Sequence, residues 1–204
     1  MTLFIFGAQP SSSSTLYQIS LKVLDLDGYG SNYSSKTMIT REILNRKKAM
    51  DANTAAPDFA LPTDQGTDFH LAEHKGQIVV LYFYPKDATP GCTKQAIAFK
   101  EHQAEFKDAN AVILGVSKDS LKKHQNFAAK QELTFALGSD EHNDVCESFG
   151  VWKEKSMYGK TYMGIERSTF VIDGDGNIAK SWRKVKVPGH VEEVLAFVQT
   201  LTAG

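Results

Sequence analysis

Cys92 stands where the chain passes from an apolar run into a segment of helix-forming residues. The apolar run covers residues 78–84, and the octapeptide Pro-Lys-Asp-Ala-Thr-Pro-Gly-Cys follows it over residues 85–92. The first turn of a helix presents unpaired N–H groups and a partial positive charge, which favour the thiolate form of a cysteine. This placement predicts a nucleophilic sulfur, whereas a lone cysteine is usually a small buried core residue.

Two motifs that are far apart in the sequence resemble the active site of the peroxiredoxins, the cysteine-based peroxidases. The first is Pro-x-x-x-Thr-x-x-Cys, formed here by Pro85, Thr89 and Cys92. The second is Arg-Ser-Thr-Phe over residues 167–170, which precedes a strand and an Asp-Gly turn, as the active-site arginine of that family does. The stretch Tyr-Pro-Lys-Asp-Ala-Thr-Pro-Gly-Cys-Thr over residues 84–93 resembles the bacterioferritin comigratory protein branch of the family, also called peroxiredoxin Q.

The resemblance covers about residues 55–202 and implies a thiol-dependent peroxidase that reduces hydrogen peroxide and organic hydroperoxides and so protects against oxidative stress. Cys92 is expected to attack one peroxide oxygen and to become a sulfenic acid. Thr89 is expected to hydrogen-bond the peroxide O–H, and Arg167 to stabilise the thiolate and the charge on the leaving oxygen. Pro85 is expected to shape the loop and to exclude water from the sulfur. The resemblance implies neither a cofactor nor a metal ion.

The oxidised Cys92 must be reduced again by a second thiol. Many members of the peroxiredoxin Q branch place a resolving cysteine five residues further on, but that position is Ile97 here. The other cysteine of the chain, Cys146, can form a disulfide only if the Cα atoms come within about 7 Å, directly or after local unfolding. We expect Cys146 to be a buried structural thiol and an external thiol, such as thioredoxin, glutaredoxin or glutathione, to be the reductant. A Cys92–Cys146 disulfide is the alternative.

Two other functions compete with the peroxidase interpretation. A thioredoxin-type disulfide oxidoreductase requires a Cys-x-x-Cys pair, and the chain has Cys-Thr-Lys-Gln over residues 92–95, which argues against that function. A holdase chaperone or a binding module on the same scaffold is compatible with the sequence. Replacement of Cys92 by serine separates this second rival from a peroxidase, because peroxide turnover depends on the sulfur and chaperone-like protection does not.

The order of the predicted elements indicates one α/β domain over residues 50–204. Strands are predicted over residues 58–61, 67–70, 77–84, 111–116, 134–137, 168–172 and 177–182, and helices over residues 92–107, 120–130, 142–149 and from Pro188 onward. The strand over residues 77–84 is continuously apolar, as a strand covered on both faces must be. The order β-β-β-α-β-α-β-α-β-β-α predicts a mixed central sheet flanked by helices, and it fits the thioredoxin-like fold in its peroxiredoxin elaboration.

Residues 1–49 differ from the rest of the chain in charge and composition. They carry six Lys or Arg and three Asp or Glu, a charge of +3, whereas residues 50–204 carry 17 and 21, a charge of −4. The segment is rich in serine and shows no helical or strand period. We expect an N-terminal extension that is disordered or not part of the mature protein, with Met50 as the biological start. A targeting peptide and an accessory arm are the alternatives.

The composition also narrows the partners and the location of the protein. A net charge of −1 gives no long-range field that attracts nucleic acid, and no apolar run approaches the ~20 residues that a membrane-spanning helix needs. We therefore expect binding to neither nucleic acid nor membrane. Two cysteines are fewer than a disulfide-stapled secreted domain carries, which indicates a reducing compartment, the cytoplasm. The resemblance to peroxiredoxin Q implies a monomer.

Overall fold

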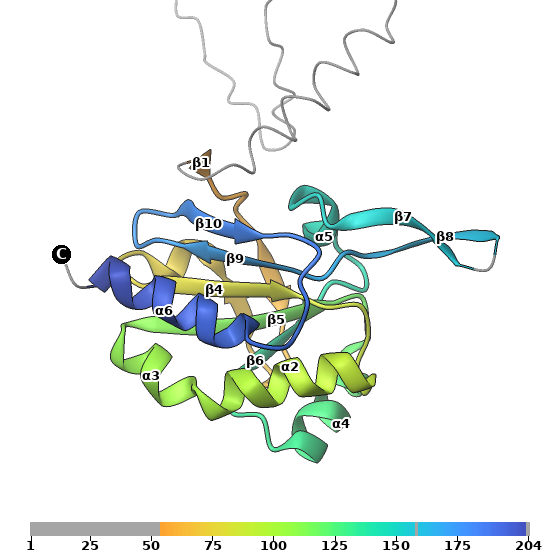
Figure 1. The fold of residues 1–204 in the computed structure, drawn as a ribbon, viewed down its shortest axis with the longest axis horizontal. Helices are drawn as coiled ribbons and strands as arrows, with labels where there is room; N and C mark the ends of the chain where they lie inside the picture. Colours follow the sequence, from red (N-terminus) through yellow and green to blue (C-terminus); the bar gives the residue numbers. More distant parts are fainter. Residues whose placement is uncertain (1–53, 158, 203–204) are drawn as a thin grey trace, which may run out of the picture.

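A computed structural model describes residues 54–157 and 159–202, and the predicted extension over residues 1–49 lies outside them. The strands of the central sheet are β1 (Thr54–Ala55), β4 (Ile78–Phe83), β5 (Ala111–Ser117), β6 (Ala136–Ser139), β9 (Ser168–Ile172) and β10 (Asn177–Trp182). Their spatial order is β1-β10-β9-β4-β5-β6 (Figure 1). β4, β5 and β6 are parallel, while β9 is antiparallel to β4, and β10 to β9. The mixed sheet confirms the predicted fold class.

The sheet is covered on both faces, and β4 shows why. Successive side chains of a strand point to opposite faces, so Val80 and Tyr82 belong to one apolar core and Val79 and Leu81 to the other. The first core packs against α2 (Pro90–Glu101), α3 (Gln103–Asp108), α4 (Leu121–Gln131) and α6 (His190–Thr202). The second core lies under the hairpin of β2 (Ala60–Pro62) and β3 (Asp68–His70), the short 3-10 helix η1 (Leu71–His74), and α5 (Val145–Ser148).

Several helix boundaries differ from those predicted. The helix predicted over residues 92–107 begins earlier, at Pro90, and is divided into α2 and α3 at His102, whose φ of −97° and ψ of 8° leave the helical range. The last helix begins at His190 rather than at Pro188, because Gly189 adopts a positive φ of 73° that a helix does not continue through. Within residues 54–157 and 159–202, no helix is both long and apolar enough to cross a bilayer.

A second hairpin, which the sequence does not predict, leads the chain back to the sheet. β7 (Trp152–Met157) pairs antiparallel with β8 (Lys160–Ile165) and projects from the body of the molecule (Figure 1). Most of the described side chains of β8 are exposed, so the hairpin lacks the apolar alternation by which strands are recognised. Its second strand ends two residues before Arg167, at the entrance to β9.

Candidate active site

The loop between β4 and α2 and the first turn of α2 carry three of the predicted site residues, Pro85, Thr89 and Cys92. Thr89 occupies the N-cap position of α2, Pro90 opens the helix, and Cys92 is its third residue. Proline suits this position because it has no N–H to leave unpaired in the first turn. Cys92 is 2% exposed. The sulfur is therefore nearly enclosed at the positively polarised end of a 12-residue helix.

Arg167 reaches this loop through the register of two strands. β9 runs antiparallel to β4, and Ser168 pairs with Phe83, so the residue before β9 lies beside the loop after β4. Nη2 of Arg167 donates a hydrogen bond to Sγ of Cys92 at 3.1 Å. The guanidinium packs against Gly91, where a Cβ atom would be in van der Waals contact with the same nitrogen, at 3.4 Å. The fold brings the predicted arginine to the predicted cysteine.

Gln95 is a site residue that the sequence reasoning missed. Its Oε1 accepts a hydrogen bond from Nη1 of Arg167 at 2.5 Å, so the guanidinium is held between Gln95 and Cys92. The side chain is 0% exposed, and its Nε2 has no hydrogen-bond partner among the described residues. Helix spacing is the signal that could have revealed it, because residues three apart lie on one face of a helix.

Thr89 and the end of α2 offer hydrogen-bonding groups of opposite kinds. The Thr89 hydroxyl donates to the carbonyl oxygen of Lys86 at 3.1 Å, which leaves its lone pairs to accept from the O–H of a substrate. The Thr93 N–H donates to the Thr89 carbonyl at 2.9 Å. The N–H groups of Gly91 and Cys92 come before that bond and have no acceptor within the helix. They are therefore available as backbone donors.

Pro85 is exposed at the rim of this loop. With Lys86 it borders a cavity of about 320 Å³, whose other wall is formed by the β7–β8 hairpin and includes Trp152, Tyr162 and Met163. Tyr162 and Met163 are large apolar side chains that are nearly half exposed. The cavity thus places an apolar surface next to the loop that carries the cysteine.

The second cysteine lies in the other core. Cys146, in α5, is completely buried in the core beneath the β2–β3 hairpin, whereas Cys92 belongs to the core on the opposite face of the sheet. The backbone N–H of Cys146 donates to Oδ2 of Asp140 at 2.9 Å. Burial, together with the nearby Asp140 carboxylate, raises the pKa of the Cys146 thiol. The fold therefore does not bring Cys146 to Cys92.

Comparison with known proteins places this geometry in a family. The sequence model of the AhpC/TSA family matches residues 52–181. The peroxiredoxin Bcp of Bacillus subtilis is 49% identical over 147 residues, which make up 72% of this chain and 94% of that protein. The peroxiredoxin Bcp of Escherichia coli is 45% identical over 150 residues, or 74% of this chain and 96% of that protein.

Solved structures of related proteins have the same fold. The peroxiredoxin Q of Xanthomonas campestris superposes with a TM-score of 0.68 at 49% identity, over 71% of this chain and 91% of that chain. The bacterioferritin comigratory protein of Xanthomonas campestris superposes with a TM-score of 0.70 at 47% identity, over 74% and 99%. The family match and these identities show that this chain is a member of the AhpC/TSA family, in the peroxiredoxin Q or bacterioferritin comigratory protein branch.

Proposed function

We propose that this protein is a thiol peroxidase that reduces hydrogen peroxide and organic hydroperoxides at Cys92. The observation that carries the proposal is the 3.1 Å contact between Nη2 of Arg167 and Sγ of Cys92 at the amino end of α2. The cation and the polarised helix end together place positive charge and hydrogen-bond donors where the leaving oxygen becomes negative. Family membership supports the same chemistry. The related bacterioferritin comigratory protein of Xanthomonas campestris has an alkyl peroxide reduction activity.

In the first half-reaction, the Cys92 thiolate attacks the peroxide oxygen that carries the hydrogen. An S–O bond forms and the O–O bond breaks, so the sulfur is oxidised by two electrons to a sulfenic acid. The other oxygen leaves with the electron pair of the broken bond and takes up a proton, which gives water or an alcohol. Thr89 accepts from the peroxide O–H, while Arg167 and the backbone N–H groups donate to the oxygens.

Hydrogen bonds to the transition state supply most of the rate. A thiol that ionises more readily is also less nucleophilic, with a Brønsted slope of ~0.4–0.5, so the thiolate form alone gives a small gain. Donors that bind the leaving oxygen more tightly as charge develops lower the barrier directly. Arg167 is suited to this role because its second nitrogen is already fixed by Gln95 and needs no reorganisation during the reaction.

We propose that an external thiol resets the enzyme. Ile97 occupies the position of the resolving cysteine found in other members of the branch, and Cys146 lies in the other core. The external thiol attacks the sulfenic sulfur, forms a mixed disulfide and releases water. A second thiol then attacks this disulfide, restores the Cys92 thiol and leaves as the oxidised disulfide. Thioredoxin, glutaredoxin and glutathione are the candidate reductants.

Residues near the site support the proposed substrate class, and the cysteine count and the exposed surface support a location and an oligomeric state. Tyr162 and Met163 offer apolar contact to the organic part of a hydroperoxide in the cavity beside Pro85. We place the protein in the cytoplasm because its two cysteines are fewer than a disulfide-stapled secreted domain carries. We expect a monomer, since the exposed large apolar side chains of the described residues are limited to Tyr162, Met163 and Leu201.

The first experiment is the intact mass of the protein after one equivalent of hydrogen peroxide without reductant. We expect a gain of one oxygen in the wild type and in Cys146→Ser, and no gain in Cys92→Ser. A gain that persists in Cys92→Ser would refute the proposed site. A loss of two hydrogens without formation of a dimer would instead assign Cys146 as the resolving residue.

A second experiment identifies the reductant. Peroxide consumption is followed with the complete thioredoxin system, with glutathione alone, and with glutathione plus glutaredoxin, each at the same peroxide concentration. Turnover in at least one of them, absent in Cys92→Ser, is expected from a one-cysteine cycle. Single oxidation of Cys92 with no turnover in any of the three would contradict the external-thiol step and leave the first half-reaction intact.

A further inference from the structure

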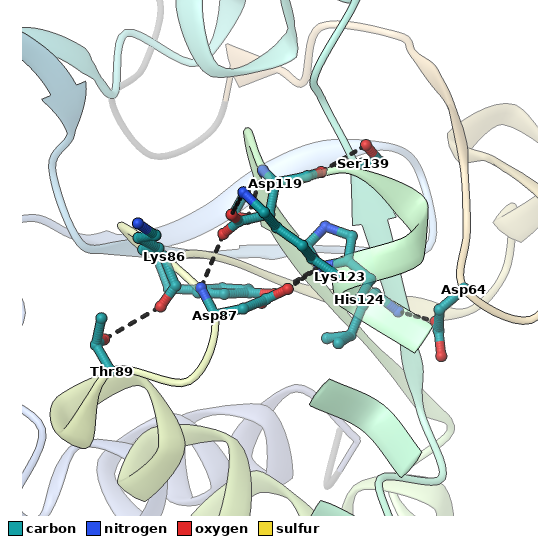
Figure 2. Close-up of polar contacts among 11 residues, drawn as sticks. Asp64, Lys86, Asp87, Thr89, Asp119, Lys123, His124 and Ser139 are labelled. Atoms are coloured by element: carbon teal, nitrogen blue, oxygen red, sulfur yellow. Dashed lines mark hydrogen bonds and ion pairs between the residues drawn. The ribbon is translucent and has the colours of Figure 1, made fainter. Parts of the chain in front are cut away.

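A buried polar cluster lies beside the loop that connects β4 to α2. It consists of Tyr84, Asp87, Ser117, Asp119 and His124, which are all buried. These residues come from the loop after β4, the end of β5, the β5–α4 connection and helix α4. Figure 2 shows Asp87 between Asp119 and His124, with Lys86 and Thr89 beside them. Burying a polar side chain costs free energy unless the side chain is hydrogen-bonded. The hydrogen bonds within the cluster therefore hold its side chains in defined positions.

Asp87 is the centre of the cluster. Its Oδ1 accepts a hydrogen bond from the Tyr84 hydroxyl at 2.7 Å, and its Oδ2 lies 2.8 Å from Nδ1 of His124. Its backbone N–H donates to Oδ2 of Asp119 at 2.8 Å. Asp87, a residue of the active-site loop, is thereby hydrogen-bonded to three places: the residue that follows β4, the β5–α4 connection and helix α4.

The contact between His124 and Asp87 fixes the tautomer of the histidine. Nε2 of His124 is buried and has no hydrogen-bond partner among the residues that the structure describes. A carboxylate oxygen can only accept a hydrogen bond, so the ring nitrogen that faces Oδ2 of Asp87 carries a hydrogen. Nδ1 of His124 is therefore the donor, and the Asp87 carboxylate receives two side-chain donors, one on each oxygen.

The anchors of the cluster are themselves fixed. Oδ2 of Asp119 accepts from the Ser117 hydroxyl at 3.1 Å, and Lys123 lies 3.2 Å from the other carboxylate oxygen. The carbonyl oxygen of Asp119 accepts from the Ser139 hydroxyl at 2.7 Å. The cluster is thus attached to the carboxyl ends of β5 and β6, which pair with each other in the central sheet.

The loop needs such an anchor because its backbone is strained. Ala88 has a φ of 56°, in the left-handed region that residues with a side chain avoid. It stands between Asp87, which the cluster holds, and Thr89, which occupies the N-cap position of α2 and donates to the Lys86 carbonyl. Strained backbone of this kind persists only where the surroundings impose it.

We propose that Asp87 and His124 are positioning residues that hold the loop closed over Cys92 in the arrangement that reacts with peroxide. This inference rests on the proposed peroxidase function. Neither residue contacts the sulfur; both act through the backbone of the loop. When their contact is lost, the strain at Ala88 is relieved, Thr89 and Cys92 leave their places, and the nearly enclosed sulfur becomes accessible to larger reagents.

Two rates measured on the same protein distinguish positioning from general stability. One is the second-order rate constant for oxidation of Cys92 by hydrogen peroxide, and the other is the rate of its alkylation by iodoacetamide. We expect His124→Ala to lower the peroxide rate about tenfold or more, because small misplacements of reacting groups cost up to about 10²-fold. We expect the same variant to raise the alkylation rate about threefold or more, because the loop opens locally.

His124→Asn is the rescue variant. Its amide nitrogen lies where the ring Nδ1 lies, so it keeps an N–H donor toward Asp87, and both rates are expected within about threefold of the wild type. Val198→Ala is the control for stability, because Val198, on α6, is buried in the apolar core that also contains Tyr84 and Cys92. It is expected to lower the unfolding free energy and to leave the two rates of the folded protein unchanged.

Opposite changes of the two rates in His124→Ala, restored in His124→Asn, support the proposal. Wild-type rates in His124→Ala, or the same opposite changes in Val198→Ala, would overturn it. If His124→Ala does not fold, Asp87→Asn replaces it, since the amide nitrogen cannot accept from the second of the two side-chain donors, Tyr84 and His124. Wild-type rates in that variant would overturn the proposal too. A wild-type Cys92 that does not react with peroxide would refute the peroxidase function instead.

Discussion

Nη2 of Arg167 lies 3.1 Å from Sγ of Cys92 although the two residues are 75 positions apart in the chain. The antiparallel pairing of β4 with β9, which sets Phe83 opposite Ser168, produces this contact. The same guanidinium reaches Gln95 through Nη1. A single side chain thus links the first turn of α2 to the entrance of β9, and its geometry leads to the first two predictions.

Arg167→Lys is expected to lower the second-order rate constant with hydrogen peroxide by about 10²–10³, the usual effect of losing one donor to a developing oxyanion. Lysine keeps the charge but cannot bind Gln95 and Cys92 together as the planar guanidinium does. The rate is measured by stopped-flow competition with a peroxidase of known rate. Arg183→Lys is the matched control, since Arg183 donates to the Gly150 carbonyl outside the site. Equal losses in both variants would argue against a specific role for Arg167.

Gln95→Leu is expected to lower the same rate constant about tenfold, because a hydrogen bond to a charged group contributes about 1.5–3 kcal/mol and part of that is lost from the transition state. The sulfenic acid is still expected to form, since Arg167 keeps its contact with Cys92. Gln103→Leu serves as the control, because Gln103 in α3 pairs with Thr134 away from the loop. A wild-type rate in Gln95→Leu would show that Arg167 needs no second partner.

Thr89→Val is expected to lower the peroxide rate constant about 10²-fold, whereas Thr89→Ser is expected to stay within about tenfold of the wild type. Valine has nearly the shape of threonine without the hydroxyl, so it removes the acceptor for the peroxide O–H. It also removes the bond to the Lys86 carbonyl. Comparison of the two variants separates the hydroxyl from the rest of the side chain, and equal rates in valine and serine variants would exclude the acceptor role.

Cys146 is expected to be inert in the folded protein. Its complete burial and its raised pKa leave it as a neutral thiol that iodoacetamide does not reach. Mass spectrometry of tryptic peptides after native alkylation is expected to find the label on Cys92 alone, and on both cysteines after denaturation. Turnover of Cys146→Ala is expected within about twofold of the wild type, as for distant independent sites. A peptide joined through Cys92 and Cys146 after oxidation would contradict this prediction.

His190 makes the stability of the fold depend on pH. Its Nε2 lies 2.8 Å from the Thr169 hydroxyl, and burial lowers its pKa to about 4, assisted by the charge of Arg167. In the unfolded chain His190 therefore takes up a proton near pH 6.5, whereas in the folded protein its side chain stays neutral until about pH 4. The contribution of His190 to the free energy of unfolding is fully present above pH 6.5. It is lost as the pH decreases toward 4, and the loss is about 3 kcal/mol at most.

Urea unfolding at a series of pH values measures this dependence. In His190→Gln the side chain cannot take up a proton, and the amide nitrogen can replace Nε2 toward Thr169. The free energy of unfolding of this variant is expected to change less between pH 6.5 and 4 than that of the wild type. An identical slope in the two proteins would show that other groups cause the loss of stability in acid.

Features that depend only on neighbouring residues could be predicted from the sequence. An apolar run, a proline-containing loop and a helix-forming segment follow one another, so β4, the loop and the start of α2 could be predicted, with Cys92 in the first helical turn. The mixed α/β fold followed from the order of such local patterns. The resemblance of two motifs supplied Arg167, which spacing alone does not connect to Cys92.

Contacts between distant side chains depend on strand register and helix packing. The register between β4 and β9 brings Arg167 to the sulfur, and the packing of α4 places His124 against Asp87. The face of the sheet on which each cysteine lies depends on how the helices and the β2–β3 hairpin cover it, so Cys146 is separated from Cys92. The β7–β8 hairpin escaped prediction because its exposed side chains carry no apolar period. Local patterns record burial and backbone preference, whereas register and the packing of distant elements are set by the whole core, and the hydrogen bonds of the site depend on these.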